Sequence, residues 1–326
     1  MVTIADIAKQ AGVAKSTVSR YLNGGSVSEK TRRKIQQIVE ETGYEPNTFA
    51  RSLKAHNTNI IGVIIPRLSS SSSSEVLTGI DHAAREMGYQ LIITNADLDP
   101  QREIENIYTL AKQKVAGIIF MAREISIEHQ KAIESIEIPV LVLGQEVEGI
   151  HTIVHADYKA GHSMGEYALK AGHRSFLYFG VPEEDKSVGM DRKQGFLDAV
   201  SQKEGSVEVV ETSFSMEKAY RDALQVLPKL KATYVACATD MMAMAVLKAA
   251  KELGFSVPES FSLSGFGGYG TVAYLSPSLT TVVYPFQQLG ELAVSHIDKL
   301  IKGQPVPKHT KMENELSVRE STRTMK

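Results

Sequence analysis

The sequence has almost no cysteine and no long hydrophobic run. Cys237 is the single cysteine among 326 residues, which excludes disulfides and cysteine-ligated metal sites, and we expect it to be buried in a strand at YVACA. The longest apolar stretches, such as IIGVIIP at residues 60–66, have the length of a strand, so no membrane-spanning helix is expected. No signal peptide precedes the first predicted helix, and we therefore expect a cytoplasmic protein.

Catalytic and cofactor motifs are also missing. The sequence contains no nucleophile elbow, P-loop or HExxH, so we expect no enzymatic activity. GFGGYG at residues 265–270 satisfies the dinucleotide pattern, but the following PSLTTVVYP leaves no room for a crossover helix. His151 and His155 are separated by β-branched residues typical of a strand, which puts them too far apart for one zinc ion. We expect neither a cofactor nor a metal.

The small net charge of −2 hides an uneven distribution of charged residues. Residues 1–58 contain nine Lys and Arg against five Asp and Glu, so they carry +4 and the remainder carries −6. A basic first segment on an acidic body predicts that a polyanion binds at the N-terminal end. The length and the ordinary content of 43% hydrophobic residues indicate a soluble protein of two or three domains.

Residues 3–22 predict two short helices around a tight turn. The first has an apolar stripe that starts at Ile4 and Ile7, a capping box of Thr3 with Asp6, and a C-terminal stop at Gly12. The second helix, residues 15–22, turns Val18 and its apolar neighbours inward and presents only short polar and basic side chains outward. Such a face without acids suits a helix in the major groove of DNA. The alternative is a pair of surface helices of some other domain.

The blocks TVSRYLN (17–23), VSEKTR (27–32), GYEPN (43–47) and ARSL (50–53) resemble the DNA-binding headpiece of the lactose/galactose repressor family of bacterial transcription regulators. Ser28 and Gly43 predict the two ends of a third helix at residues 29–42, and Asn47 predicts the start of a short helix at about 48–55. The resemblance implies that this short helix is a hinge helix that orders on operator DNA and inserts Leu53 into the minor groove. Without the headpiece, a linker helix that packs on the body would be an equal alternative. The complete set of expected DNA-binding residues is Thr3, Lys15, Ser16, Thr17, Ser19, Arg20, Asn23, Thr31, Tyr44, Asn47, Arg51, Leu53 and Lys54.

From residue 60 onward, strands alternate with helices in two consecutive sets. Strands are expected at 60–66, 89–96, 117–122, 139–144, 176–180, 207–211, 233–239, 262–266 and 280–285, and helices at 75–87, 100–114, 127–136, 160–171, 191–204, 216–227, 241–253 and 287–302. The fold class is therefore an all-α helix-turn-helix headpiece plus an α/β periplasmic-binding-protein-like core of two doubly wound parallel-sheet subdomains. We expect a headpiece at 1–45, a hinge at 46–58, and an effector-binding and dimerisation domain at 59–326. Its subdomains would span about 59–157 with 287–316, and 158–286 with 317–326.

Ligands of open α/β sheets bind beyond the carboxyl ends of the strands. Serines 69–74 follow the first strand, and we expect their hydroxyl groups at the cleft, although a flexible serine linker is the alternative. The resemblance implies that Arg192 clamps the effector and that Phe214 lies against a sugar face; Arg192 could instead cap loop carbonyls. Asp240 could accept ligand hydroxyls, cap the following helix, or do both. The expected effector-binding residues are Ser70, Ser72, Ser73, Met121, Arg192, Phe214, Asp240, Gly267 and Tyr284.

Gly267 stands where relatives usually have a sugar-binding aspartate, and its small size predicts room for a second sugar ring. GFGGY, with IIPR and LGQE (143–146), resembles the sucrose-operon repressors of Gram-positive bacteria. The effector is therefore predicted to be a neutral sugar, with sucrose or its fructosyl part preferred. A phosphate dianion would need a second Lys or Arg beside Arg192. The sequence does not place one at these strand ends, and Arg67 is the nearest candidate.

The predicted function is a homodimeric transcriptional repressor that binds a near-palindromic operator and releases it when a small sugar binds. One alternative is a global carbon-catabolite regulator of the same family, activated by a phosphoprotein partner. A solute-binding protein for transport would need a signal peptide and would have no use for a basic headpiece. No membrane partner is expected.

Overall fold

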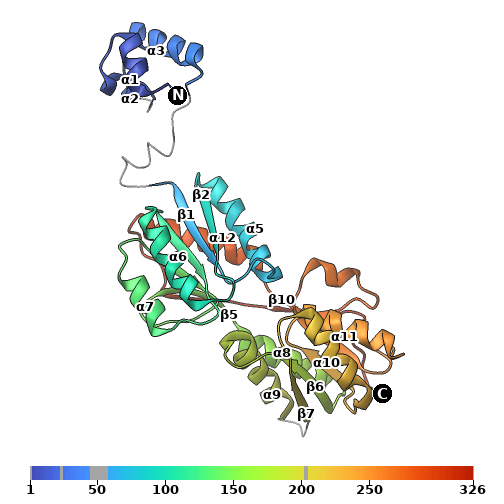
Figure 1. Ribbon diagram of the computed structural model, residues 1–326. Coiled ribbons are helices and arrows are strands. Elements are labelled where there is room, and N and C mark those ends of the chain that lie inside the picture. The colour runs from blue at the N-terminus through green and yellow to red at the C-terminus, as the bar shows by residue number, and fades with distance from the viewer. Residues whose placement is uncertain (1, 23–24, 45–57, 202–204, 326) are drawn as a thin grey trace. The chain divides into compact units, whose positions relative to one another are not determined.

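The computed structural model describes residues 2–22, 25–44, 58–201 and 205–325. The chain divides into two compact units, residues 1–58 and 59–326, which we treat separately (Figure 1). Among the described residues, no helix has both the length and the apolar character needed to cross a bilayer. The predicted hinge helix at about 48–55 lies outside the described residues.

The described residues of the first unit form three helices, α1 (Ile4–Ala11), α2 (Lys15–Leu22) and α3 (Glu29–Thr42). Thr3 and Asp6 form the predicted capping box, and Gly12 ends α1 in the left-handed conformation with φ 64°. Ser28 caps α3, and Gly43 ends it. The small core holds Ile7, Ala8, Ala11, Val18, Ile35 and Ile38. The predicted helices of the headpiece are confirmed.

The second unit contains two six-stranded sheets, each of which forms one lobe. The first lobe has the order β11-β5-β4-β3-β1-β2. Its strands are β1 (Ile60–Ile65), β2 (Gln90–Asn95), β3 (Gly117–Met121), β4 (Val140–Leu143), β5 (His151–His155) and β11 (His309–Met312), all parallel. Its helices are α5 (Ser71–Glu86), α6 (Pro100–Lys112), α7 (Ile127–Glu134) and α12 (Phe286–Ile301).

Alternate residues of β1 face two different cores. Ile61, Val63 and Ile65 pack with α5 and α12, whereas Ile60 and Ile64 pack with α6 and α7. This arrangement explains why IIGVIIP is apolar on both faces: the sheet is covered on both sides. The prediction of a doubly wound subdomain is confirmed by this layering.

The second lobe has the order β12-β10-β9-β8-β6-β7 and one large core. Its strands are β6 (Ser175–Gly180), β7 (Ser206–Glu211), β8 (Tyr234–Cys237), β9 (Ser262–Gly267), β10 (Thr280–Val283) and β12 (Glu315–Ser317); only β12 is antiparallel to its neighbour. Its helices are α8 (Asp157–Lys170), α9 (Lys193–Ser201), α10 (Met216–Val226) and α11 (Asp240–Glu252), with short 3₁₀ turns at Leu227–Lys229 and Gly270–Tyr274. Cys237 is a free, fully buried thiol of β8, as predicted.

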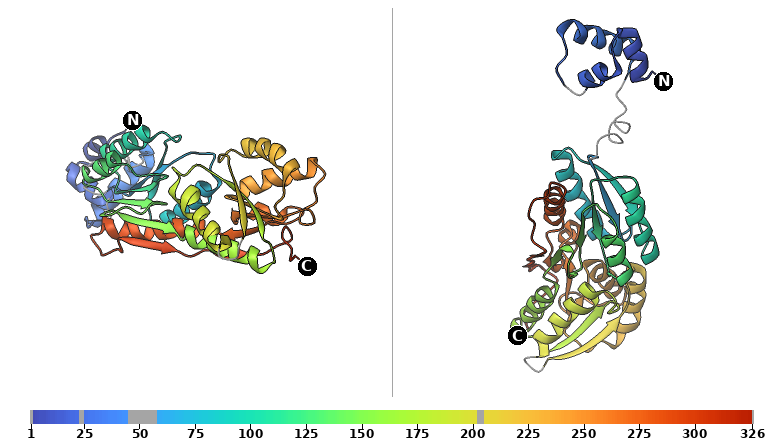
Figure 2. Two further views of the ribbon diagram at one scale, coloured as in Figure 1. Left: turned by 90° about the horizontal axis from the view of Figure 1, so that it is seen from below. Right: turned by 90° about the vertical axis from the view of Figure 1, so that its left-hand side faces the viewer.

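The chain passes between the sheets three times: after β5, after β10 and after β11. The second passage carries α12 back to the first lobe, as predicted, where it packs beside α5 (Figures 1 and 2). A Cβ at Gly79 would collide with the carbonyl oxygen of Gln287, so glycine permits the close approach of these helices. Because β12 already pairs with β10 at Glu315, the third passage comes slightly before the expected boundary at about residue 316.

Three predicted helix starts differ from the structure by two residues or more. α5 begins at Ser71 rather than 75, because the Ser70 hydroxyl accepts the amide of Ser73 and caps the helix within the serine run. α8 begins at Asp157 rather than 160. The helix predicted from residue 191 is α9, preceded by a π-helix at Lys186–Arg192. There the amide of Met190 reaches back five residues to the carbonyl of Asp185, a wider turn that sequence periodicity does not reveal.

Candidate functional site

The outer face of α2 is basic and polar. Val18 is buried, whereas Lys15, Ser16 and Arg20 are exposed and Thr17 and Ser19 are half-buried. No acidic residue lies within α2. This face can therefore approach a phosphate backbone and place short side chains and a guanidinium against base edges.

Several other predicted DNA-binding residues also hold the headpiece together. The Thr3 hydroxyl donates to a carboxylate oxygen of Asp6 at 2.7 Å, and the hydroxyl groups of Thr31 and Ser28 lie 2.8 Å apart. Tyr44 packs against the headpiece core. Asn23, Asn47, Arg51, Leu53 and Lys54 lie outside the described residues. The DNA contacts of all these residues remain predictions.

In the core unit, the predicted effector residues gather where strands end. Met121 ends β3 and Gly267 ends β9, while Ser70, Phe214 and Tyr284 follow β1, β7 and β10. Arg192 and Asp240 follow β6 and β8. This is the edge at which open parallel sheets bind ligands.

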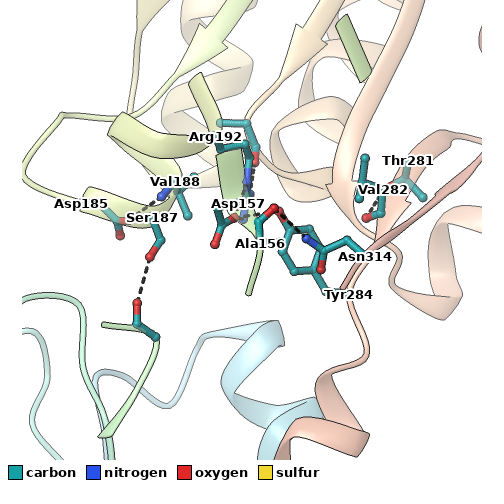
Figure 3. A network of polar contacts seen from close by, with 12 residues as sticks. Ala156, Asp157, Asp185, Ser187, Val188, Arg192, Thr281, Val282, Tyr284 and Asn314 are labelled. Atoms are coloured by element: carbon teal, nitrogen blue, oxygen red, sulfur yellow. Dashed lines mark hydrogen bonds and ion pairs between the residues drawn. The ribbon is translucent and has the colours of Figure 1, made fainter. Parts of the chain in front are cut away.

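Arg192 is the centre of a buried polar network (Figure 3). Its Nε and Nη2 donate to Oδ1 of Asp157 at 3.0 and 2.5 Å, and its Nη1 donates to the carbonyl of Ala238 at 2.6 Å. The Tyr284 hydroxyl donates to the same Asp157 oxygen at 2.7 Å. The guanidinium also lies over the ring of Tyr284, at 4.8 Å from its centroid. The alternative that Arg192 binds a loop carbonyl is therefore present in the structure, and its contact with an effector remains a prediction.

The charges of this network stabilise each other. Burial alone would lower the pKa of Arg192, but the charge and hydrogen bonds of Asp157 raise this pKa above its usual value. Burial also raises the pKa of the Tyr284 hydroxyl well above its usual range. Arg192 therefore stays a cation and Tyr284 stays a neutral donor.

Asp240 holds the GFGGYG loop. Its Oδ1 accepts from the hydroxyl of Thr281 at 2.6 Å, and its Oδ2 accepts from the amides of Gly268 and Tyr269 at 2.7 and 3.2 Å. Burial raises the pKa of Asp240 to about 6 despite these hydrogen bonds. The expectation that Asp240 caps the following helix is wrong, because the hydroxyl of Thr239 accepts the Met242 amide and serves as the N-cap.

The space beside Gly267 is filled by Tyr269. A Cβ at Gly267 would lie 2.7 Å from Cε2 of Tyr269 and 3.1 Å from Oδ2 of Asp240. Gly267 also has φ 142°, which favours glycine over any other residue. A side chain at this position would therefore be strained, and the room for a second sugar ring beside Gly267 stays a prediction.

Three aromatic rings stack where the chain passes between the lobes, and sequence reasoning singled out only one of them. Phe286 stacks on Tyr269 and on Tyr284, with centroids 5.7 and 5.5 Å apart. His155 meets Tyr284 and Phe286 edge-on. Phe286 directly follows the predicted strand 280–285, and this position was the available signal.

The remaining predicted effector residues are partly engaged in packing. The Ser70 and Ser72 hydroxyl groups lie 3.0 Å apart, and Ser73 is buried. Met121 packs in the core of the first lobe. The ring of Phe214 is covered by the guanidinium of Arg67, 5.2 Å from its centroid. Phe214 belongs to the second lobe and Arg67 to the first, so this contact joins the lobes.

A second contact between lobes is a hydrogen bond from the Ser187 hydroxyl to the carbonyl of Gly144, at 2.9 Å (Figure 3). Beside it lies a cavity of about 310 Å³, lined by residues that include Gly144, His155, Asp157 and Lys186. None of the predicted effector residues lines this cavity. The predicted site is therefore the opposed strand ends rather than this cavity.

The fold and the site define a class of protein: a helix-turn-helix unit with a basic recognition helix, joined to a two-lobed α/β ligand-binding core. Comparisons with known proteins agree. Residues 3–47 match "Bacterial regulatory proteins, lacI family", and residues 166–322 match "Periplasmic binding protein-like domain". The chain belongs to the lacI family of bacterial transcriptional regulators.

Three similar proteins cover nearly the whole chain. The sucrose operon repressor of Staphylococcus xylosus is 40% identical and covers 94% of this chain and 96% of its own. Catabolite control protein A of Staphylococcus epidermidis is 29% identical over 94% of both chains. The lac repressor dimer, crystallised with operator and the anti-inducer ONPF, has a TM-score of 0.91 at 24% identity and covers 99% of each chain. The last likeness concerns the fold.

Proposed function

We propose that this protein is a homodimeric repressor of a sucrose-utilisation operon that releases its operator when a sugar effector binds. The observation that carries the proposal is the 40% identity to a sucrose operon repressor over 94% of the chain. A match of that extent includes both the basic face of α2 and the strand ends of the core.

In this proposal the chain has three functional parts. Residues 1–45 bind one half-site of a near-palindromic operator per subunit, with Lys15, Ser16 and Arg20 reading the sequence. Residues 46–58 form the hinge, where Leu53 wedges the minor groove. Residues 59–326 dimerise and bind the effector, with Arg192 as the clamp and Phe214 against a sugar face.

The effector acts by changing the arrangement of the lobes. A sugar that closes the cleft shifts the first lobe, disorders the hinge and lowers the affinity for operator. By linkage, the operator lowers the affinity for the sugar by the same factor. The protein acts in the cytoplasm, where its DNA lies, and its role is binding rather than catalysis.

One alternative has an observation of its own. The likeness to catabolite control protein A fits a global carbon-catabolite regulator that a phosphoprotein partner activates. In that case sugar alone would leave the operator complex intact.

The test is an operator-release assay. Operator is first selected from random duplexes by the ligand-free dimer, and binding is then followed by fluorescence anisotropy as sugars are added. Release by a sugar alone is the expected result. A complex that persists with every sugar, and strengthens only with a phosphoprotein, would favour the alternative.

A further inference from the structure

Two arginines of the first lobe occupy equivalent positions after neighbouring strands. β1 and β3 pair in parallel with Ile64 opposite Phe120, and Arg67 and Arg123 each follow three residues later. Both guanidinium groups therefore leave the sheet at the same edge and the same level, on the side where the second lobe faces the first.

The donors of these two side chains are poorly satisfied. Arg67 forms no hydrogen bond or ion pair with any described residue, and its guanidinium lies over Phe214. The Nε of Arg123 is buried and has no hydrogen-bond partner among the described residues. Burial lowers the pKa of Arg67, and the nearby charge of Arg123 lowers it further. Two cations thus lie close together with donors to spare.

The carboxylates of the cleft compensate for this pair only in part. Asp157 is bound by Arg192, and Asp240 is bound by Thr281 and two loop amides. Asp185 forms an ion pair with Arg123, with 4.0 Å between its Oδ2 and Nε of the arginine, and its Oδ1 accepts the amide of Val188. One described carboxylate therefore faces two guanidinium groups, and the arginine pair keeps an excess of positive charge.

The surroundings suit an anion attached to a sugar. The first turn of α5, which contains no acidic residue, begins four residues after Arg67, and its Ser72 hydroxyl lies near Tyr269, which in turn lies near Arg67. A sugar ring on Phe214 would take the place that Arg67 now occupies and would leave its guanidinium free to fork onto oxygen atoms. Paired guanidinium groups are the usual protein partners of phosphate.

We propose that the effector is a sugar phosphate whose phosphoryl group binds between Arg67 and Arg123. This inference rests on the proposed function and names the chemical class of its effector. It replaces the neutral sugar that the sequence favoured, because sequence reasoning had no second cation to place beside Arg67. Parallel pairing of β1 with β3 supplies that cation as Arg123.

The test compares esters with their neutral parents by calorimetry and operator release. The probes are sucrose, sucrose 6-phosphate, fructose, fructose 6-phosphate, glucuronate and inorganic phosphate. We expect at least one ester to bind about tenfold or more tightly than its parent sugar, since two charge-assisted contacts are added. Arg67→Gln and Arg123→Gln should each reduce this ester-to-parent ratio about tenfold. Arg102→Gln, which removes an exposed arginine from the same lobe, should leave the ratio unchanged.

Each other outcome has a defined meaning. Equal affinities for ester and parent, or equal losses for both in the arginine variants, overturn the sugar-phosphate proposal. Tight binding of glucuronate alone shows that a carboxylate is recognised and also overturns it. If a glutamine variant does not fold, Arg67→Lys and Arg123→Lys replace it and should show a smaller loss of the same ratio. Failure of the ligand-free dimer to bind any selected operator would contradict the proposed function itself, whichever sugar binds.

Discussion

At the scale of single residues, the buried charged groups around Arg192 are each bound by other buried residues of the core. Arg192, Asp157, Tyr284 and the carbonyl of Ala238 satisfy one another in the second lobe. Removing one member of a buried ion pair leaves the other unpaired, which costs more than removing both. Residues of the effector cleft therefore contribute to folding as well as to any ligand binding.

Arg192→Ala should lower the free energy of unfolding by about 3–5 kcal/mol, because Asp157 would remain buried without its cation. Urea unfolding of the core measures this. Arg221→Ala, which removes an exposed arginine paired with Glu217, should cost no more than about 0.5 kcal/mol. If the Arg192 variant unfolds at the same urea concentration as the unaltered protein but no longer responds to effector, the role of Arg192 is ligand binding alone.

His155 gives a prediction about pH. Burial lowers its pKa from 6.5 to about 4, and neither ring nitrogen has a hydrogen-bond partner within the described part of the chain. At a pH between these two pKa values, His155 is protonated in the unfolded chain and neutral in the folded chain. Stability should therefore fall as the pH drops from about 6.5 to about 4, by up to about 1.4 kcal/mol per pH unit from this group.

Thermal or urea unfolding across that range, compared with His155→Leu, isolates the contribution of His155. The leucine variant should lose part of the pH dependence, whereas His151→Leu on the same strand should keep it. Identical pH profiles for His155→Leu and the unaltered protein would show that His155 is protonated in the folded state as easily as in the unfolded state.

At the scale of elements, the exposed side of α2 is predicted to determine which DNA sequence the protein binds. Arg20→Ala should cost about 1–3 kcal/mol on the selected operator and much less on random DNA, because a guanidinium that contacts a base edge is lost. Anisotropy titrations on both duplexes give the two values. Arg33→Ala removes the same charge from the exposed face of α3 and should weaken binding to both duplexes equally. Equal losses for Arg20→Ala would mean that Arg20 touches only phosphate.

The serine run at residues 69–74 belongs largely to a helix, although the sequence predicted that the helix starts only at residue 75. Ser71–Ser74 form the first turn of α5 rather than a loop, with Ser70 as its cap. The cap turns one hydroxyl to the helix's own amide, so this serine is first a structural residue. A homopolymeric run contains no periodicity from which the helix start could have been located.

At the scale of the whole molecule, the basic first segment and the acidic remainder predict strongly salt-dependent DNA binding. Residues 1–58 carry +4 and the rest carries −6, so counterion release at the headpiece should dominate non-specific affinity. Operator affinity should fall at least about tenfold between about 50 mM and about 200 mM salt. The slope of log affinity against log salt concentration measures this dependence. An operator affinity that does not change with salt would contradict the assignment of the headpiece as the DNA-binding unit.

The sequence by itself determined those features whose signals are local. The capping box of Thr3 with Asp6, the stop at Gly12, the apolar strand 60–65 and the strand-end positions of Arg192 and Asp240 depend on residues within a few positions of each other. Alternation of helices and strands in two sets then restricted the core to two parallel sheets with ligands at their carboxyl edges.

Only the tertiary structure decided which side chains meet across that edge. Asp157 and Arg192 are 35 residues apart, and Asp240 and Thr281 are 41 apart, so no local pattern links them. The register of β1 against β3 brings Arg67 level with Arg123. The hydrogen bond of the Tyr269 amide to Asp240 brings the ring of Tyr269 beside Gly267. Strand register and loop closure result from the packing of the entire lobe, which is why the pairing of charged side chains in the cleft could not be obtained from spacing alone.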